Sequence, residues 1–239
     1  MSIQQNTNHF DISYNTLRQC MGVLAIAMPV LLWSATLRHG NCNEILSSIS
    51  SYHHTHAGHI FTAISVLMAV VFYIYRGYDN DYIFMRIAAV LALGVAFVPN
   101  EQAIDIASCV LDDTTKETWT AIPEGCFITT NKNCTLAYIH LACAVGFFAM
   151  LSYISICRFT KSCISKEELG SAKRRRNRIY VVCGVTMIVT MILILIYFIG
   201  RETYLSGLVQ YDPIFWGEWI MIWAFGIAWL TKGQIWAKD

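Results

Sequence analysis

Five of the seven histidines in this chain lie at the edges of two apolar segments, where imidazole groups could bind a metal ion or carry protons. Imidazole is costly to desolvate at a membrane boundary and is a common metal ligand, so this placement indicates a functional site. The five are His53, His54, His56 and His59, around the start of one segment, and His140, about one turn inside another.

Zinc is the metal ion that these residue types favour. His56 and His59 are three residues apart and would share one face of the helix if it starts early enough to include both. With His54, His140 and a carboxylate, they could form a tetrahedral zinc site that keeps one position open for water. Zinc lowers the pKa of bound water toward about 7, so the resulting hydroxide could hydrolyse a lipid amide or ester.

Two carboxylates are expected at the same depth as the histidines. Glu218 lies about one turn inside an apolar segment, where a carboxylate is expensive unless it is paired, protonated or hydrated. Glu101 follows the end of another apolar segment. Either could serve as a general base or a metal ligand, and a shared metal or a pair with His140 would lower the cost of burying both groups.

Each of these residues also has an ordinary structural alternative. Histidines 53 to 59 could be hydrated interfacial residues, and His140 could be a hydrogen-bonded packing residue. Glu218 could be a structural partner of Arg201, Tyr138 or a histidine. His59 and His140 could also ligate a haem iron from two sides. The residues alone leave these alternatives open.

The composition is typical of an integral membrane protein with a single domain. Of the 239 residues, 56% are hydrophobic and only 14% are charged, and the mean hydropathy is +0.47. A soluble domain carries about 25% charged residues. The sequence contains no nucleotide-binding loop, no internal repeat and no stretch long enough for a soluble catalytic domain, so we expect no nucleic-acid partner.

An all-α bundle of six transmembrane helices is the predicted fold. Each of six apolar segments is long enough to cross a hydrocarbon core of about 30 Å, which requires roughly 20 residues. The segments are residues 17–37, 59–75, 82–98, 136–157, 179–200 and 214–230.

The lysines and arginines predict the orientation of this bundle. With the N-terminus inside, thirteen of the seventeen basic residues fall on the cytoplasmic side, and eight of them lie in the loop 158–178. This asymmetry matches the positive-inside rule. We therefore expect both termini in the cytoplasm, the loop 99–135 outside, and location in a plasma membrane of the bacterial inner-membrane type.

Four cysteines fall on the predicted outer side: Cys42, Cys109, Cys126 and Cys134. An even number on an oxidising face favours two disulfides, which would staple the outer loop. Of the three pairings, we favour Cys126 with Cys134 and Cys42 with Cys109. Free thiols and metal ligation by the same four residues are the alternatives.

The run Ser50-Ser51-Tyr52-His53-His54 resembles the S-x-x-x-H element of CREST-type membrane hydrolases, the group of alkaline ceramidases, hemolysin III proteins and adiponectin receptors. The resemblance implies a seven-helix fold, zinc-dependent hydrolysis of lipid amides, His54 as a zinc ligand and Ser50 beside the catalytic centre. The family's H-x-x-x-H on the last helix is absent here. The layout otherwise resembles six-helix bacterial inner-membrane proteins.

Three functions follow from these observations. The first is a metal-dependent lipid hydrolase with its site at the outer-leaflet end of the bundle. The second is a non-enzymatic scaffold or receptor-like subunit that binds a protein or lipid partner through its outer loops. The third is a small transporter, although transporters usually place their polar groups near the membrane midplane.

Overall fold

The computed structural model describes residues 13–39, 45–77, 80–100, 134–162, 170–200 and 203–235, and these residues form helices and no strands. Short helical segments connect or extend the α-helices: η1 (Ser50–His54), η4 (Ile154–Arg158, a π-helical continuation of α4) and η5 (Ser206–Tyr211). The α-helices are α1 (Tyr14–His39), α2 (Gly58–Ile74), α3 (Asp81–Phe97), α4 (Cys134–Tyr153), α5 (Ser171–Gly200) and α6 (Pro213–Lys232). The all-α class predicted from the sequence is confirmed.

Four helical stretches are long and apolar enough to cross a membrane: Tyr14–Arg38, Thr135–Arg158, Ser171–Gly200 and Pro213–Lys232. The α2 helix is also apolar, but it has 17 residues, as does α3. At 1.5 Å per residue, such a helix is about 26 Å long, slightly less than the hydrocarbon core. The structure therefore supports the membrane class and four spans by length and composition.

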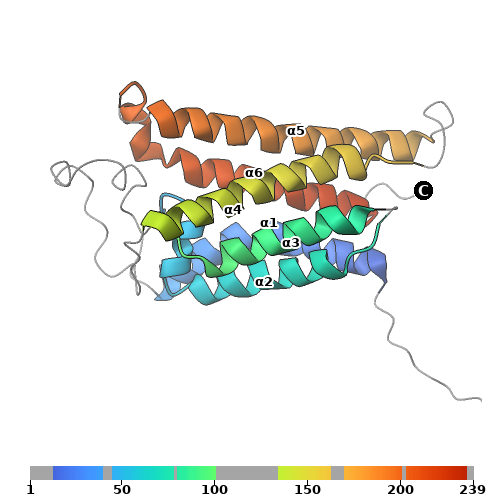
Figure 1. The fold of residues 1–239 in the computed structure, drawn as a ribbon, viewed down its shortest axis with the longest axis horizontal. Coiled ribbons are helices and arrows are strands. Elements are labelled where there is room, and N and C mark those ends of the chain that lie inside the picture. The colour runs from blue at the N-terminus through green and yellow to red at the C-terminus, as the bar shows by residue number, and fades with distance from the viewer. Residues whose placement is uncertain are drawn as a thin grey trace, which may run out of the picture.

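The six α-helices lie side by side in a closed ring (Figure 1). Each helix packs against its neighbour in sequence, and α6 returns to pack against α1. The short connection between α2 and α3 favours antiparallel packing of these two helices. The ring brings the start of α1, α3 and α5 to one end of the bundle, together with the last turns of α2 and α6 and with η4.

Aromatic rings fill the interior of the bundle. The ring of Phe72 on α2 lies 5.9 Å from that of Phe147 on α4 and 5.8 Å from that of Phe225 on α6. Trp229, 1% exposed, contacts the same cluster at 5.6 Å from Phe72. Large rings of this kind bury much apolar area and prefer tilted contacts. They hold helices together that are not neighbours in the ring.

Two glycines set the distance between α1 and α6. A Cβ added at Gly22 would lie 2.8 Å from the Gly226 carbonyl oxygen and 2.5 Å from Leu230 Cγ. A Cβ at Gly226 would lie 3.0 Å from the Gly22 carbonyl oxygen. The backbones therefore approach too closely for any side chain, which is the packing that small residues permit in membrane helices.

The outer surface of α5 is strongly apolar. Its most hydrophobic 18-residue window is only 22% buried within the bundle, and Val182 and Ile199 are 62% and 73% exposed. Soluble monomers rarely expose large contiguous apolar surface. In a lipid environment this apolar surface would contact acyl chains and not water.

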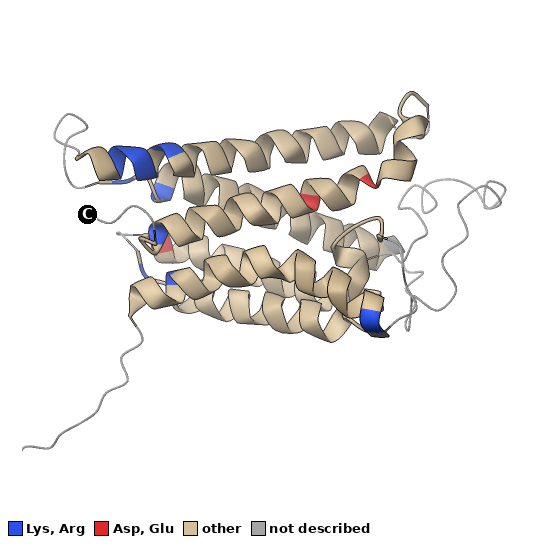
Figure 2. Cartoon of the chain, turned by 180° about the vertical axis from the view of Figure 1, so that it is seen from behind, with Lys and Arg blue, Asp and Glu red and all other residues tan. Residues whose placement is uncertain are grey.

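Charged residues are segregated along the bundle axis (Figure 2). We call the end where α1, α3 and α5 begin the basic end, and the opposite end the far end. Among the described residues, Arg38, in the last turn of α1, is the one lysine or arginine at the far end. The basic end carries Arg18, Arg76, Arg86, Arg158, Lys161, Lys173, Arg174, Arg175, Arg176, Arg178 and Lys232.

Candidate functional site

The predicted histidine and carboxylate site lies at the far end, where the segment from residue 45 to residue 57 packs over the helices. Within it, η1 is almost wholly buried, and the Tyr52 ring, 0% exposed, lies 6.2 Å from the ring of Phe215 on α6. This burial fixes the position of the histidines that follow Tyr52 in the chain.

Thr55 and Gly58 connect η1 to α2 in a tight turn. The Thr55 hydroxyl donates to the Tyr52 carbonyl at 2.8 Å and accepts from the Ala57 N–H at 3.1 Å. These bonds satisfy groups that would otherwise be unpaired between two helices. A Cβ at Gly58 would collide with the His53 carbonyl, so the turn requires glycine at this position.

His54 and His140 both bond to the chain that leaves α3. His54, 2% exposed, donates from Nε2 to the Asn100 carbonyl oxygen at 2.8 Å. His140, 4% exposed, donates from Nδ1 to the Val98 carbonyl oxygen at 2.6 Å. Carbonyls at a helix C-terminus have no intrahelical partner, and buried ones need a donor. The two imidazoles supply it.

His53 completes a group of three neighbouring imidazoles. Its ring is edge-on to the His54 ring, with 5.3 Å between centroids, and both rings are close enough to His140 to act on it electrostatically. Burial lowers the pKa of His53, and the neighbouring His54 lowers it further, against an opposing hydrogen bond to the Ala96 backbone. Neither His53 Nδ1 nor His140 Nε2 has a hydrogen-bond partner among the described residues.

Glu218 anchors the start of η1. Its Oε2 accepts a hydrogen bond from the Ile49 N–H at 2.5 Å, and the Ser50 backbone also acts on the carboxyl group. A carboxylate beside the free N–H groups of a helix start is stabilised by those donors. Glu218 therefore joins α6 to η1 through a backbone contact. Arg201, one of its expected alternative partners, lies outside the described residues.

The structure brings together only part of the predicted metal set. His54 and His140 lie in the buried group, whereas His56 and His59 are exposed. Among the described residues, no three histidine, cysteine, aspartate or glutamate side chains are grouped so that they could hold a metal ion. Zinc binding by these histidines therefore stays a prediction.

Several predicted residues lie outside the described part of the chain. They are Glu101 and the cysteines Cys42, Cys109 and Cys126, and for Cys134 only its place at the start of α4 is described. The two predicted disulfides are therefore untested. Ser50, 8% exposed, lies one turn before His54 in η1, as the S-x-x-x-H spacing requires.

The sequence did not predict that the residues just after α3 accept hydrogen bonds from the histidines. The group also includes His53, the Val98 and Asn100 carbonyls and the Asn100 side-chain amide, which lies against the backbone of Ser50 and Ser51. Pro99 was the available signal, because proline cannot continue a helix and leaves carbonyls that need other donors.

No protein-family model, curated protein or solved structure matches this chain. A function must therefore be inferred from the geometry of the chain itself.

Proposed function

We propose that this chain is a six-span integral membrane protein that works as a non-catalytic scaffold or receptor-like subunit, with its far end as a rigid platform. Both termini lie in the cytoplasm. The positive-inside rule supports this orientation, because the basic end holds nearly all the described lysines and arginines.

The closed ring supports six spans. The α2 helix packs against α1 and α3, and α3 packs against α4. If the four longer helices cross the bilayer, α2 and α3 lie alongside them with the same axis (Figure 1). Polar ends and local thinning of the bilayer can compensate for a helix that is a few ångströms short.

The scaffold proposal rests on the hydrogen bonds that the polar side chains at the far end form with backbone groups. Three polar side chains each bond to a backbone group outside their own element: His54, His140 and Glu218. Together these bonds join η1, the end of α3, α4 and α6. Residues 101–133 follow directly from this joined end. A fixed base of this kind suits the presentation of a loop to a protein partner.

The proposal predicts that these residues stabilise the fold and do not hold a metal. Leaving a buried donor or acceptor without its partner costs about 1–3 kcal/mol. Glu218→Leu removes the acceptor of the Ile49 N–H and should therefore destabilise the protein clearly, and His140→Asn should do so to a similar or smaller degree. In a protein of this size, each kcal/mol corresponds to about 2–4 °C in Tm. The exposed His56→Asn is the matched control and should leave Tm unchanged.

Elemental analysis of the same purified samples distinguishes the scaffold from a metalloenzyme. The scaffold proposal expects no stoichiometric zinc in the wild-type protein. One zinc ion per chain that is lost in His140→Asn and retained in His56→Asn would overturn it.

A zinc-dependent lipid hydrolase is the second candidate, because of one observation. The buried Nε2 of His140 has no hydrogen-bond partner among the described residues, and His53 and His54 are close enough to His140 to act on it electrostatically. An unpartnered buried nitrogen is an available metal ligand. This candidate predicts zinc-stimulated hydrolysis of lipid amides or esters that both His140→Asn and Glu218→Gln abolish.

A further inference from the structure

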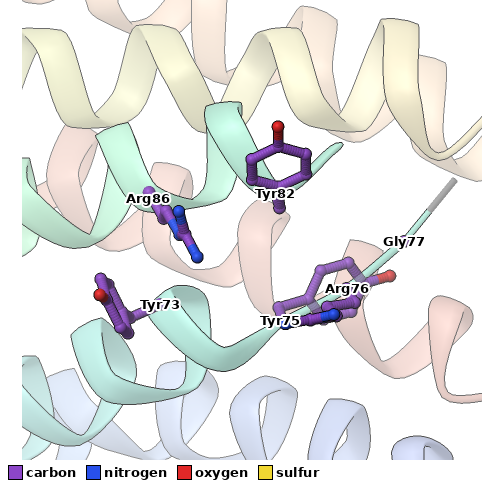
Figure 3. A pocket seen from close by; sticks show the side chains of 6 residues that line it. All are labelled: Tyr73, Tyr75, Arg76, Gly77, Tyr82 and Arg86. Carbon is purple, nitrogen blue, oxygen red and sulfur yellow. The ribbon is translucent and has the colours of Figure 1, made fainter. Parts of the chain in front are cut away.

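A second polar site lies at the basic end, where α2 passes to α3. It is a pocket of about 280 Å³ (Figure 3). Since a water molecule occupies about 30 Å³ in the liquid, this space holds about nine waters and can accommodate a phosphate with part of its headgroup. The pocket is lined by Tyr73, Tyr75, Arg76, Gly77, Tyr82 and Arg86.

Arg86 is positioned by two aromatic rings. Its guanidinium carbon lies 5.2 Å from the ring centroid of Tyr73 and 5.2 Å from that of Tyr82 (Figure 3). Cation–π contacts of this kind hold an arginine through its planar face. The N–H donors point outward in the plane of the group, so they can still form the paired hydrogen bonds that phosphate oxygens accept.

Arg76 and Tyr75 form the opposite side of the pocket. Arg76 is exposed, whereas Tyr75 is buried and its hydroxyl accepts a hydrogen bond from Arg18 at 3.2 Å. Arg18 also lies over the Tyr75 ring, with its guanidinium carbon 5.4 Å from the ring centroid. It adds positive charge behind Tyr75, which lines the pocket. No ion pair involves Arg76 or Arg86 within the described residues.

The described carboxylate beside the pocket is already compensated. Asp81 lies next to Gly77, where an added Cβ would contact its side chain. Asp81 forms a buried ion pair with Arg158, whose positive charge neutralises that of the carboxylate. Among the described residues, the lining of the pocket therefore keeps the positive charge of its two arginines.

The pocket opens toward the surface that we assign to lipid. Tyr73, Tyr82 and Arg86 are exposed on the outside of the bundle, and Ile83, Ile87 and Val90 on α3 are 42%, 41% and 67% exposed. Arg86 lies five residues inside α3, or about 7 Å from its start, a depth from which arginine reaches the headgroup region. Tyrosines are enriched at the same depth.

We propose that this pocket binds the phosphate group of an anionic phospholipid in the leaflet at the basic end. The two arginines bind the phosphate, and the tyrosine hydroxyls form hydrogen bonds with neighbouring headgroup oxygens. The exposed isoleucines contact the acyl chains. A soluble phosphate would use the arginines in the same way but would leave the apolar surface without a partner.

The test measures lipid binding to the full chain by native mass spectrometry in detergent, with phosphatidylglycerol and phosphatidylcholine as probes. Wild-type protein should prefer phosphatidylglycerol. An arginine that acts directly on an anionic headgroup at a membrane surface contributes about fivefold to its affinity, so the double variant Arg76→Gln/Arg86→Gln should lose at least about tenfold. Arg175→Gln removes an exposed charge at the same end outside the pocket, and it should change the affinity less than twofold.

A conservative variant and a phosphate arm complete the experiment. Arg86→Lys keeps the charge but loses paired hydrogen bonding, so it should bind phosphatidylglycerol with intermediate affinity. Inorganic phosphate at millimolar concentration should compete weakly. Equal phosphatidylglycerol binding by the wild-type protein and a folded double variant would overturn the proposal, and so would equal loss in Arg175→Gln. Full competition by inorganic phosphate without a lipid preference would overturn the lipid assignment.

Discussion

The two ends of the bundle use polar side chains in opposite ways. At the far end, two imidazoles and a carboxylate bond to backbone groups of other elements, through His54, His140 and Glu218. At the basic end, arginines rest on aromatic rings, as Arg86 does on Tyr73 and Tyr82. The first arrangement uses hydrogen-bonding capacity to fix the chain. The second keeps N–H donors available for a ligand.

This difference separates stability from binding. The far end should respond to substitution mainly through the free energy of unfolding, and the pocket at the basic end mainly through affinity for anions. The basic end also contains structural charges, however, and the buried pair of Asp81 and Arg158 belongs to that class.

The largest effect is expected from Asp81→Asn. The substitution leaves Arg158, 7% exposed, buried without its carboxylate. Breaking a buried ion pair by removing one partner destabilises a protein by about 3–5 kcal/mol. We expect a fall in Tm of roughly 10 °C, measured by thermal unfolding in detergent. The double variant Asp81→Asn/Arg158→Met should recover much of this loss, and a double variant as unstable as the single one would contradict the ion-pair explanation.

Gly22→Ala should have the next largest effect. Its new methyl group would lie 2.8 Å from the Gly226 carbonyl oxygen, so α1 and α6 must move apart. Overpacking of this kind costs about 1–3 kcal/mol. Gly207→Ala is the matched control, because no heavy atom lies within 4 Å of an added Cβ there. Equal Tm values for the two variants would show that the close approach is not needed.

Thr55→Val should have a smaller effect. It keeps the shape of the side chain but removes the hydroxyl bonds to Tyr52 and Ala57. Loss of a capping hydroxyl costs about 1 kcal/mol. Hydrogen exchange should rise in η1 and the first turn of α2 and stay unchanged in α5. Ser34→Ala, at an exposed position on α1, should change neither region.

The helices were predictable from hydropathy to within a few residues. The predicted segments 59–75 and 82–98 correspond to Gly58–Ile74 and Asp81–Phe97. The start of α5 was missed, since the segment predicted from residue 179 begins at Ser171. A hydropathy window ends where lysines and arginines begin, although such residues are good helix formers outside the membrane.

The site was less predictable, because spacing does not specify the direction of a helix face. His56 and His59 were predicted to share a helix face if the helix begins early enough, but α2 begins at Gly58, after His56, and both histidines are exposed. The partners of His54 and His140 are backbone carbonyls, which carry no sequence signature except the proline that ends α3. The pocket around Arg86 depends on three tyrosines from both sides of a turn, and only the fold brings them together.

One measurement tests the division between the two ends directly: the Tm of the full chain in detergent with added phosphatidylcholine or phosphatidylglycerol. We predict that Glu218→Leu, which removes the acceptor of the Ile49 N–H, lowers Tm by several degrees in both lipids and keeps the wild-type gain from phosphatidylglycerol. Arg76→Gln/Arg86→Gln should match the wild type in phosphatidylcholine and lose that gain. The opposite pattern, with the lipid gain lost in Glu218→Leu and retained in the arginine variant, would contradict the account.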